Sequence, residues 1–276
     1  MPNYVPYFIL IIISLILLSV VIIHKKQFGF IVLFLSFSGM VYVAEIFVMI
    51  IGNSYVYNPE VLSVEYYDHA LGAIVSNFFI IPSLGLVAAV YQLRVRWCVL
   101  FALTLVGVEW LFEWLNIYHT NWWRYEYTLI SVLTFCSLTK LWLRILQRGK
   151  WLIFLSVWMQ GWACAGTVMY IMSVATIRHY EIGVFENVYR DDIFILSIMG
   201  LMKGLIFVVA ILCFKKLYWR LLAPIMVYGI DLPLYYFGVL VVEIPFWLYT
   251  IIYLVLAILL LWWTHYAYSF IRKIST

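Results

Sequence analysis

Residues 5–23 read VPYFILIIISLILLSVVII, a run without a charged side chain, and Lys25 and Lys26 follow it almost directly. A run of this length and composition can cross the hydrocarbon core of a bilayer as one helix. No basic region precedes it and no small-residue cleavage site follows it, so we expect a retained membrane-spanning helix and not a signal peptide. The rest of the chain repeats this pattern of apolar runs and short charged turns, which predicts an integral membrane protein.

The composition of the whole chain supports the same class. Of 276 residues, 67% are apolar or aromatic and 11% are charged, with a mean hydropathy of +1.04, whereas soluble domains carry about 25% charged residues. The formal charge of +4 comes from basic residues spread in short groups between apolar runs, which is typical of membrane loops and argues against a nucleic-acid partner. The cysteines stand singly, so we expect no disulfide framework, no zinc site and no cofactor: Cys98, Cys136, Cys164 and Cys213.

Nine apolar runs are long enough to span a membrane. They lie near residues 5–23, 28–52, 69–92, 97–118, 127–146, 151–174, 193–213, 221–241 and 244–270. The sequence therefore predicts an all-α integral membrane protein with nine transmembrane helices.

The turns between these runs alternate between basic and acidic. One set holds 13 of the 17 basic residues and no acid: Lys25, Lys26, Arg94, Arg96, Lys140, Arg144, Arg148, Lys150, Lys215, Lys216, Arg220, Arg272 and Lys273. The other set holds acids, with only three basic residues: Glu60, Glu65, Asp68, Glu126, Glu181, Glu186, Asp191, Asp192 and Glu243 beside Arg124, Arg178 and Arg190. Because Lys and Arg accumulate in short cytoplasmic loops, this asymmetry predicts an amino terminus outside and a carboxyl terminus in the cytoplasm.

The chain also resembles itself at an offset of about 123 residues. The matched positions are Tyr66, Asp68 and His69 with Tyr189, Asp191 and Asp192, Arg94 and Trp97 with Lys216 and Trp219, and Glu109 with Asp231. We therefore expect a leading helix, 1–23, and two four-helix repeats, 24–147 and 148–276, that form one membrane domain. Four spans is an even number, so the repeats would be parallel in the membrane. The alternative is that two hydrophobic halves align through composition alone.

A set of single residues on the apolar runs of the first half suggests a family. The set is Asp68, Ser76, Asn77, Pro82, Glu109, Ile117, Tyr118, Trp122, Trp123, Ser131 and Phe135. Over residues 8–150 this pattern resembles a family of uncharacterised multi-pass proteins of spore-forming Gram-positive bacteria. The resemblance implies a bacterial cytoplasmic membrane and supplies no activity. The consecutive acids of membrane-bound terpene and lycopene cyclases are absent, since Asp231 is followed by Leu232, Pro233 and Leu234.

Three charged residues lie deep within the predicted spans. Glu109, Lys203 and Asp231 are each 11 to 13 residues beyond the preceding charged turn, which places them near the midplane. A charge there costs at least about 2.5–3.5 kcal/mol, so such residues normally face the interior of the helix bundle. One interpretation is a binding or proton-exchange site between the repeats. The other is a structural ion pair that holds the two halves in register.

Further polar side chains extend this cluster toward the outer surface. Glu113 shares a helical face with Glu109, and Glu45 and Asn77 lie in the outer parts of their spans, so all three join the predicted intramembrane cluster. An outer vestibule is predicted from Asp68, His69, His119 and Asp191. The alternative for these residues is a solvated position at a helix start, where acids are favoured. No HxxxH or HExxH spacing occurs, so we expect no metal site.

These features favour a small transporter or ligand-binding permease, with a small-molecule or lipidic ligand. A second hypothesis is a non-catalytic component of a membrane complex in envelope or spore development, with a membrane protein as partner. A third is a membrane-embedded enzyme that modifies a lipid or isoprenoid, with Glu109 or Asp231 as general acid.

Overall fold

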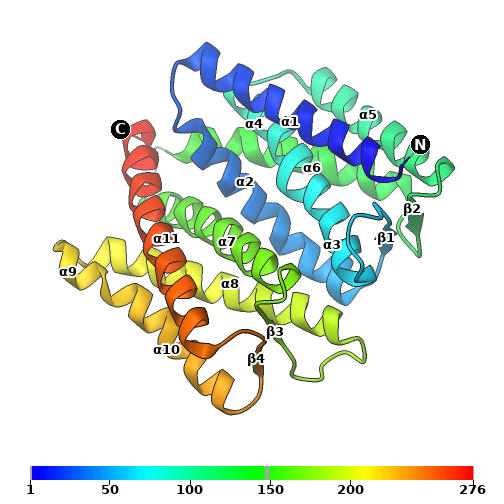
Figure 1. Cartoon of the computed structure of the whole chain (residues 1–276). Coiled ribbons are helices and arrows are strands. Elements are labelled where there is room, and N and C mark those ends of the chain that lie inside the picture. The colour runs from blue at the N-terminus through cyan, green and yellow to red at the C-terminus, as the bar shows by residue number, and fades with distance from the viewer. Residues whose placement is uncertain (1, 147–148, 276) are drawn as a thin grey trace. The chain divides into compact units, whose positions relative to one another are not determined.

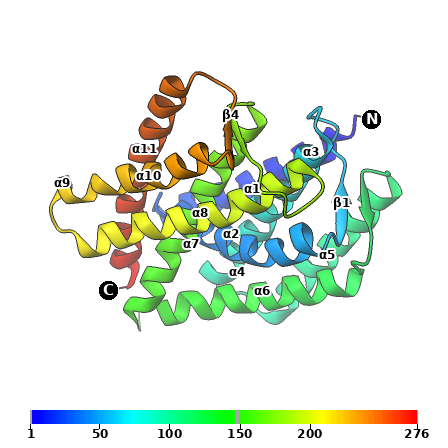
Figure 2. The same cartoon turned by 90° about the horizontal axis from the view of Figure 1, so that it is seen from below.

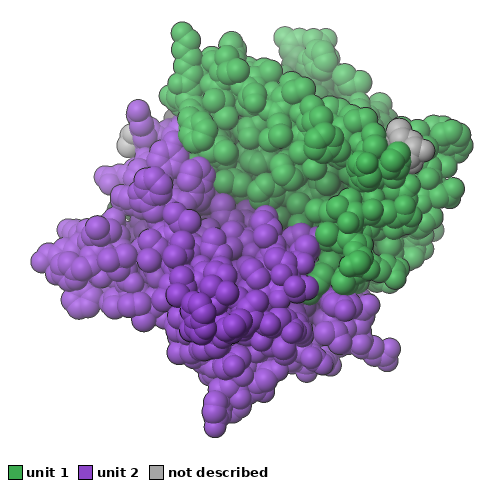
Figure 3. Space-filling model, viewed as in Figure 1, with its two compact units in different colours: residues 1–152, 275 green, residues 153–274, 276 purple. Residues whose placement is uncertain are grey.

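The computed structural model describes residues 2–146 and 149–275. Arg148 and the boundary predicted between residues 147 and 148 lie outside the described residues. The described chain forms two compact units, unit 1 with residues 1–152 and unit 2 with residues 153–274, apart from the last two residues of the chain (Figure 3).

Unit 1 is a bundle of helices with one short two-stranded sheet (Figure 1). Its elements are α1 (Tyr4–Lys25), α2 (Phe30–Glu45), the π-helix η1 (Ile46–Ile51), β1 (Tyr55–Tyr57), α3 (Glu65–Ile74), the π-helix η2 (Val75–Ile80), α4 (Ile81–Val90), α5 (Val95–Trp114), β2 (Tyr118–Thr120) and α6 (Tyr125–Ile145). Strands β1 and β2 are antiparallel, with Tyr57 opposite Tyr118.

Unit 2 has helices and one short sheet as well. Its elements are α7 (Lys150–Val174), β3 (Arg178–Tyr180), α8 (Val188–Cys213), α9 (Leu217–Arg220), α10 (Leu222–Tyr236), β4 (Leu240–Val242) and α11 (Phe246–Ser275). Strands β3 and β4 are antiparallel, with Tyr180 opposite Leu240. Helices α8 and α10 lie side by side (Figure 2).

Eight helical segments of the described chain are long and apolar enough to cross a membrane. They are Tyr4–Lys25, Phe30–Ile51, Glu65–Val90, Val95–Trp114, Tyr125–Ile145, Lys150–Val174, Val188–Cys213 and Phe246–Ile274. Each overlaps one predicted span, and the chain is a multi-pass membrane protein with an all-α architecture. The span predicted at 221–241 is not among the eight, because α10 has only 15 residues and is separated from α9 by Leu221.

Two predicted spans extend too far at their carboxyl ends. Helix α5 ends at Trp114 and not near residue 118, and α10 ends at Tyr236 and not near residue 241. Just beyond them, Asn116 and Gly238 have φ angles of 57° and 72°. A left-handed residue terminates a helix, and Asn and Gly tolerate this conformation best. Apolar and aromatic residues continue beyond both helix ends, to Tyr118 after α5 and into β4 after α10, so apolarity alone does not mark where the helices end.

Small side chains allow the helices of unit 1 to approach one another. Helix α4 packs against α1, α2 and α6. A Cβ atom on Gly85 of α4 would lie 2.6 Å from the ring of Phe135 on α6. A core cluster then joins α4, α5 and α6 through the buried residues Ala88, Cys98, Ala102, Val132 and Cys136. In lipid, where helix association depends on close packing, such small residues are typical of helix interfaces.

Helices α7 and α8 of unit 2 cross at glycines. A Cβ atom on Gly200 would lie 3.1 Å from the backbone of Gly166, and one on Gly204 would lie 2.9 Å from the backbone nitrogen of Trp162. The backbones are therefore in direct contact, which brings the middle of α8, including Lys203, close to α7.

The substitution Gly204→Ala is expected to destabilise unit 2. The added methyl group cannot fit against a rigid backbone, so the two helices must separate, at a cost of about 1–3 kcal/mol. The measurement is the melting temperature of the purified protein in detergent. Gly229→Ala on α10 is the matched control, because no atom lies within 4 Å of the added Cβ. Equal melting temperatures for the two variants would contradict the close crossing.

Candidate functional site

Lys203 and Asp231 form a buried ion pair in unit 2. The Nζ atom of Lys203 lies 2.7 and 2.9 Å from the two carboxylate oxygens of Asp231, and the two residues are 3% and 1% exposed. Lys203 comes from α8 and Asp231 from α10. The depth argument predicts one cluster of Glu109, Lys203 and Asp231 between the repeats, and the contact joins Lys203 and Asp231 within unit 2.

Tyrosines surround the pair. The hydroxyl groups of Tyr180 and Tyr249 donate to Asp231 at 3.3 and 3.1 Å, and Lys203 donates to the Tyr180 oxygen at 3.2 Å. The ammonium group also lies 5.1 Å from the ring centroid of Tyr253, within range of a cation–π contact. Burial raises the pKa of Tyr180 well above its usual value, so its hydroxyl stays protonated and can donate to the carboxylate.

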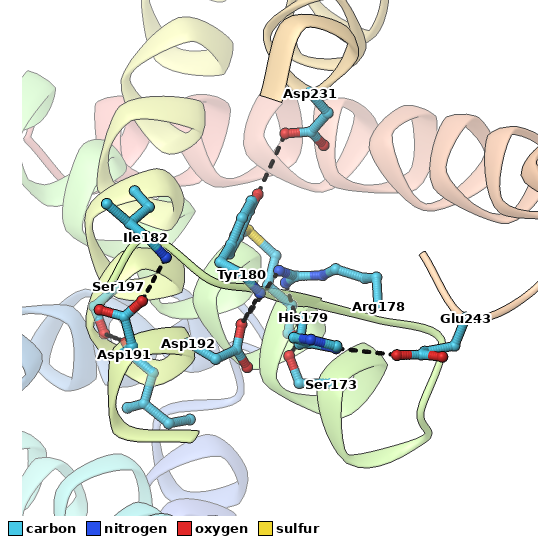
Figure 4. Close-up of polar contacts among 12 residues, drawn as sticks. Ser173, Arg178, His179, Tyr180, Ile182, Asp191, Asp192, Ser197, Asp231 and Glu243 are labelled. Carbon is cyan, nitrogen blue, oxygen red and sulfur yellow. Dashed lines mark hydrogen bonds and ion pairs between the residues drawn. The ribbon is translucent and has the colours of Figure 1, made fainter. Parts of the chain in front are cut away.

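Arg178 of strand β3 makes a second buried ionic contact, with Asp192 (Figure 4). The guanidinium of Arg178 stacks on the ring of Tyr180 at 4.5 Å, donates to the carbonyl of Met169 at 3.0 Å, and lies 3.9 Å from Asp192. The other side of β3 is different, because His179 contacts Glu243 at 3.4 Å where both side chains are partly exposed. Unit 2 therefore contains a buried network that links β3, α8, α10 and α11.

The cavity beside this network is small. Its volume is about 20 Å³ and it adjoins Lys203, Phe207 and Tyr253, which is room for at most about one water molecule. Lys203 and Asp231 thus neutralise one another within the protein.

Unit 1 instead contains a cavity of about 430 Å³, here called the unit 1 cavity. This volume lies within the range of about 300–1,000 Å³ that is usual for small-molecule sites. Most of its wall is apolar, contributed by α1, α2, η2, α5 and α6. Its polar side chains include Glu45, Tyr55, Tyr57, Asn77, Glu109 and Thr128.

Hydroxyl groups hold both cavity carboxylates. The Tyr55 hydroxyl donates to the two oxygens of Glu45 at 2.7 and 2.8 Å. Tyr118 and Thr128 donate to Glu109 at 3.1 and 2.5 Å. Burial raises the pKa of Tyr55 and Tyr118 far above the usual value, so both remain neutral donors. Each acid is thus oriented by the short sheet, whose strands carry the two tyrosines.

Asn77 and two π-helices complete the cavity. Asn77 is 3% exposed, and its amide nitrogen makes no hydrogen bond of normal geometry among the described residues, although it is near enough to Glu45 to interact with it. It lies in η2, while η1 begins directly after Glu45. Helical segments of π type are rare and occur frequently at functional sites.

The two acids of the predicted outer vestibule accept hydrogen bonds from the backbone of the loops that precede them. Asp68 accepts hydrogen bonds at 2.8 Å from the backbone nitrogens of Glu60, Val61 and Leu62. Asp191 accepts four such bonds, at 2.6 to 3.3 Å, from residues 182–185. Both acids are buried, at 3% and 0% exposed. Their observed contacts are therefore with the backbone of their own loops, at the starts of α3 and α8.

The remaining predicted residues lie outside the unit 1 cavity lining. His69 is buried, and its Nδ1 accepts from the backbone nitrogen of Tyr57 at 3.0 Å. Glu113 is bonded to Thr120 and Tyr125. His119 is an exposed residue of β2. The predicted cluster is thus divided: Lys203 and Asp231 pair within unit 2, whereas Glu45, Asn77 and Glu109 line one cavity within unit 1.

Several side chains of these two sites are not part of the predicted cluster, namely the tyrosines of the strands, Arg178 and Thr128. The segments 55–57 and 178–180 are predicted as loops between spans, and Tyr118 and Thr128 lie at the ends of predicted spans. A signal was present, since the tripeptides YVY and RHY end in Tyr57 and Tyr180 at the same offset of 123 as Asp68 and Asp191.

Within the described residues, no group of three or more His, Cys, Asp or Glu side chains could hold a metal ion. Comparison of the chain with protein-family models, curated proteins and solved structures finds no match. The resemblance of residues 8–150 to the family of spore-forming bacteria stays a prediction.

Proposed function

We propose that this protein is a small permease of the bacterial cytoplasmic membrane, and that its ligand binds in the unit 1 cavity. The observation that carries the proposal is a cavity of about 430 Å³ with two buried carboxylates, inside a bundle of apolar helices. Intramembrane acids normally mark substrate or ion pathways or a structural pair. Glu45 and Glu109 have hydroxyl partners and no basic residue among the described cavity lining, which favours a pathway or binding role.

We further propose that units 1 and 2 descend from a duplication and that α9 and α10 together form a ninth span. The two sheets support the duplication, because β3 lies 123 residues after β1, β4 lies 122 residues after β2, and the residues of each pair of strands face one another in the same register. The left-handed residues Asn53, Glu60 and Asn116 correspond in the same way to Thr176, Gly183 and Gly238. Loop carboxylates recur as Asp68 and Asp191. The 20 residues from Leu217 to Tyr236, with helical rise of about 1.5 Å each, would cover the apolar core of a bilayer.

Nine spans place the two termini on opposite sides of the membrane, and the basic turns place the carboxyl terminus in the cytoplasm. Cysteine labelling tests the ninth span, which lies between Lys216 and Glu243. In a background with the four native cysteines replaced by serine, a membrane-impermeant maleimide is expected to label the Glu243→Cys variant in intact cells. The Lys216→Cys variant should react only after the membrane is permeabilised. Labelling of both variants in intact cells would show that these loops share one side, and the nine-span topology would be wrong.

Permease activity can be tested with purified protein in liposomes. Radiolabelled alkylammonium ions, amino acids, sugars and fatty acids are offered one at a time, and retained label is compared with protein-free liposomes. We expect one class to enter faster with the protein and Glu109→Gln to remove most of that flux, because Glu109 is one of the two carboxylates that line the cavity. Glu126→Gln, an exposed acid at the start of α6, is the matched control. If no class enters faster, the permease proposal fails.

The same assay separates transport from catalysis. An enzyme that acts on a lipid would convert the ligand, so extracts of the liposomes would contain a product of different mass. Recovery of the unchanged solute inside the vesicles supports a permease.

A further inference from the structure

We propose that the unit 1 cavity binds a primary alkylammonium ion, with its ammonium group at Glu109 and Glu45 and its alkyl chain along the apolar wall. This inference rests on the proposed function, since it names the ligand class of the same cavity. It also rests on the proposed duplication, because unit 2 contains an ammonium group at the corresponding place.

The carboxylates of the two units have corresponding surroundings. Asp231 and Glu109 each lie on the helix that precedes the second strand of their unit. Each accepts a hydroxyl from the first turn of the helix after that strand, from Tyr249 in unit 2 and from Thr128 in unit 1. The backbone hydrogen bonds in the first turns of these two helices lie at sequence positions that differ by 121 residues. At this offset, Tyr249 of unit 2 corresponds to Thr128 of unit 1.

The strand tyrosines correspond as well. Tyr180 ends β3 and contacts both members of the ion pair, and Tyr57 is its counterpart at the end of β1. Tyr57 lines the unit 1 cavity and is near enough to Glu45 and Glu109 to interact with both. The acceptor groups that surround the Lys203 ammonium in unit 2 therefore have counterparts of the same chemistry at corresponding positions in unit 1.

The difference between the units lies at position 203. At offsets of 123 and 122, Lys203 corresponds to Ile80 or Ile81, and both isoleucines line the unit 1 cavity. Unit 2 thus supplies its own ammonium beside a cavity of about 20 Å³, whereas unit 1 has apolar side chains at this position beside a cavity of about 430 Å³. In unit 1 we therefore expect a ligand to supply the cation that Lys203 provides internally in unit 2.

The remaining lining favours a cation with an apolar tail. Two carboxylates face the cavity, and among its described lining residues none is Lys, Arg or His. A carboxylate in apolar surroundings is costly unless it is paired. An ammonium group offers up to three donors to Glu45, Glu109 and the carbonyl of Asn77, while most of the wall can contact only hydrocarbon.

The test uses purified protein in a nonionic detergent and n-octylammonium chloride as probe, with 1-octanol, octanoate and methylammonium for comparison. A ligand that binds only the folded state raises the melting temperature. At saturation, octylammonium is expected to raise the melting temperature by about 5 °C, and the other three probes by much less. Methylammonium has the ammonium group without the alkyl chain, so its shift shows how much of the binding depends on contact with the apolar wall.

Variants then locate the bound probe. The octylammonium shift should disappear in Glu45→Gln/Glu109→Gln, decrease strongly in Ile80→Lys, which introduces an internal ammonium, and persist in Glu126→Gln. If Ile80→Lys does not fold, the comparison of probes on the unaltered protein still decides. An equal shift with octanol or octanoate, or an undiminished shift in the double variant, would overturn the alkylammonium assignment and leave ligand binding intact. No shift with any probe and no solute flux would overturn the permease proposal itself.

Discussion

The substitution Lys203→Met is expected to lower the melting temperature of the detergent-solubilised protein by roughly 10 °C. Asp231 is 1% exposed, and removal of its partner leaves an uncompensated carboxylate in an apolar interior. Loss of one member of a buried ion pair costs about 3–5 kcal/mol, and each kcal/mol corresponds to roughly 2–4 °C in a chain of this size class. Tyr180 and Tyr249 would still donate to Asp231 and would soften the loss without replacing the charge.

A double-mutant cycle gives this prediction its control. Asp231→Asn alone should be destabilising by a similar amount, because it leaves the ammonium group of Lys203 buried without a counter-ion. The double variant Lys203→Met/Asp231→Asn should be more stable than the sum of the two single losses, since no charge remains. Lys215→Met removes an exposed lysine near the end of the same helix and should have little effect. Additive losses in the cycle would show that the two side chains do not depend on one another.

The substitution Arg178→Met is expected to have the second largest effect on stability, with a loss of about 3 kcal/mol or more. Arg178 is 2% exposed, and its removal takes away the ionic contact with Asp192 and the hydrogen bond to the carbonyl of Met169. The face of Tyr180, which packs under the guanidinium, would also lose its partner. Thermal unfolding in detergent, followed by the retained monomer peak in size-exclusion chromatography, measures the loss.

His179→Gln is the matched control on the same strand. His179 pairs with Glu243 where both side chains are partly exposed, and ion pairs of this kind contribute about 0–1 kcal/mol. A loss for His179→Gln as large as that for Arg178→Met would mean that strand β3 itself, and not the buried contact with Asp192, is what these substitutions disturb.

The membrane class and the location of most spans could be read from local chemistry. A helix crosses lipid because its side chains are apolar over about 20 residues, and that property needs no knowledge of neighbouring helices. The depth of Lys203 and Asp231 is also a local property, measured along the chain from the charged turns. Because unpaired charges at that depth are costly, their pairing was a sound expectation, and the contact of 2.7 Å agrees with it.

Other features depend on which segments meet. Helix α5 ends at Trp114 because Asn116 takes a left-handed conformation and the chain then joins β1 as strand β2. Hydropathy does not detect such a pairing, since it scores each residue by itself and carries no information about which segments form hydrogen bonds. The loop acids Asp68 and Asp191 were also ambiguous in sequence, because a carboxylate at a helix start can face solvent or can accept the amides of a preceding loop.

Insertion into lipid, and the need of a few deep charges for partners, follow from the residues alone, because the transfer of side chains from water to hydrocarbon is a sum over local groups. The tertiary structure then sets which partners these charges have. It paired Lys203 with Asp231 inside unit 2 and left Glu109 with hydroxyl groups and a cavity inside unit 1. That outcome depends on helix crossings and strand registers, and neither is a property of composition or spacing.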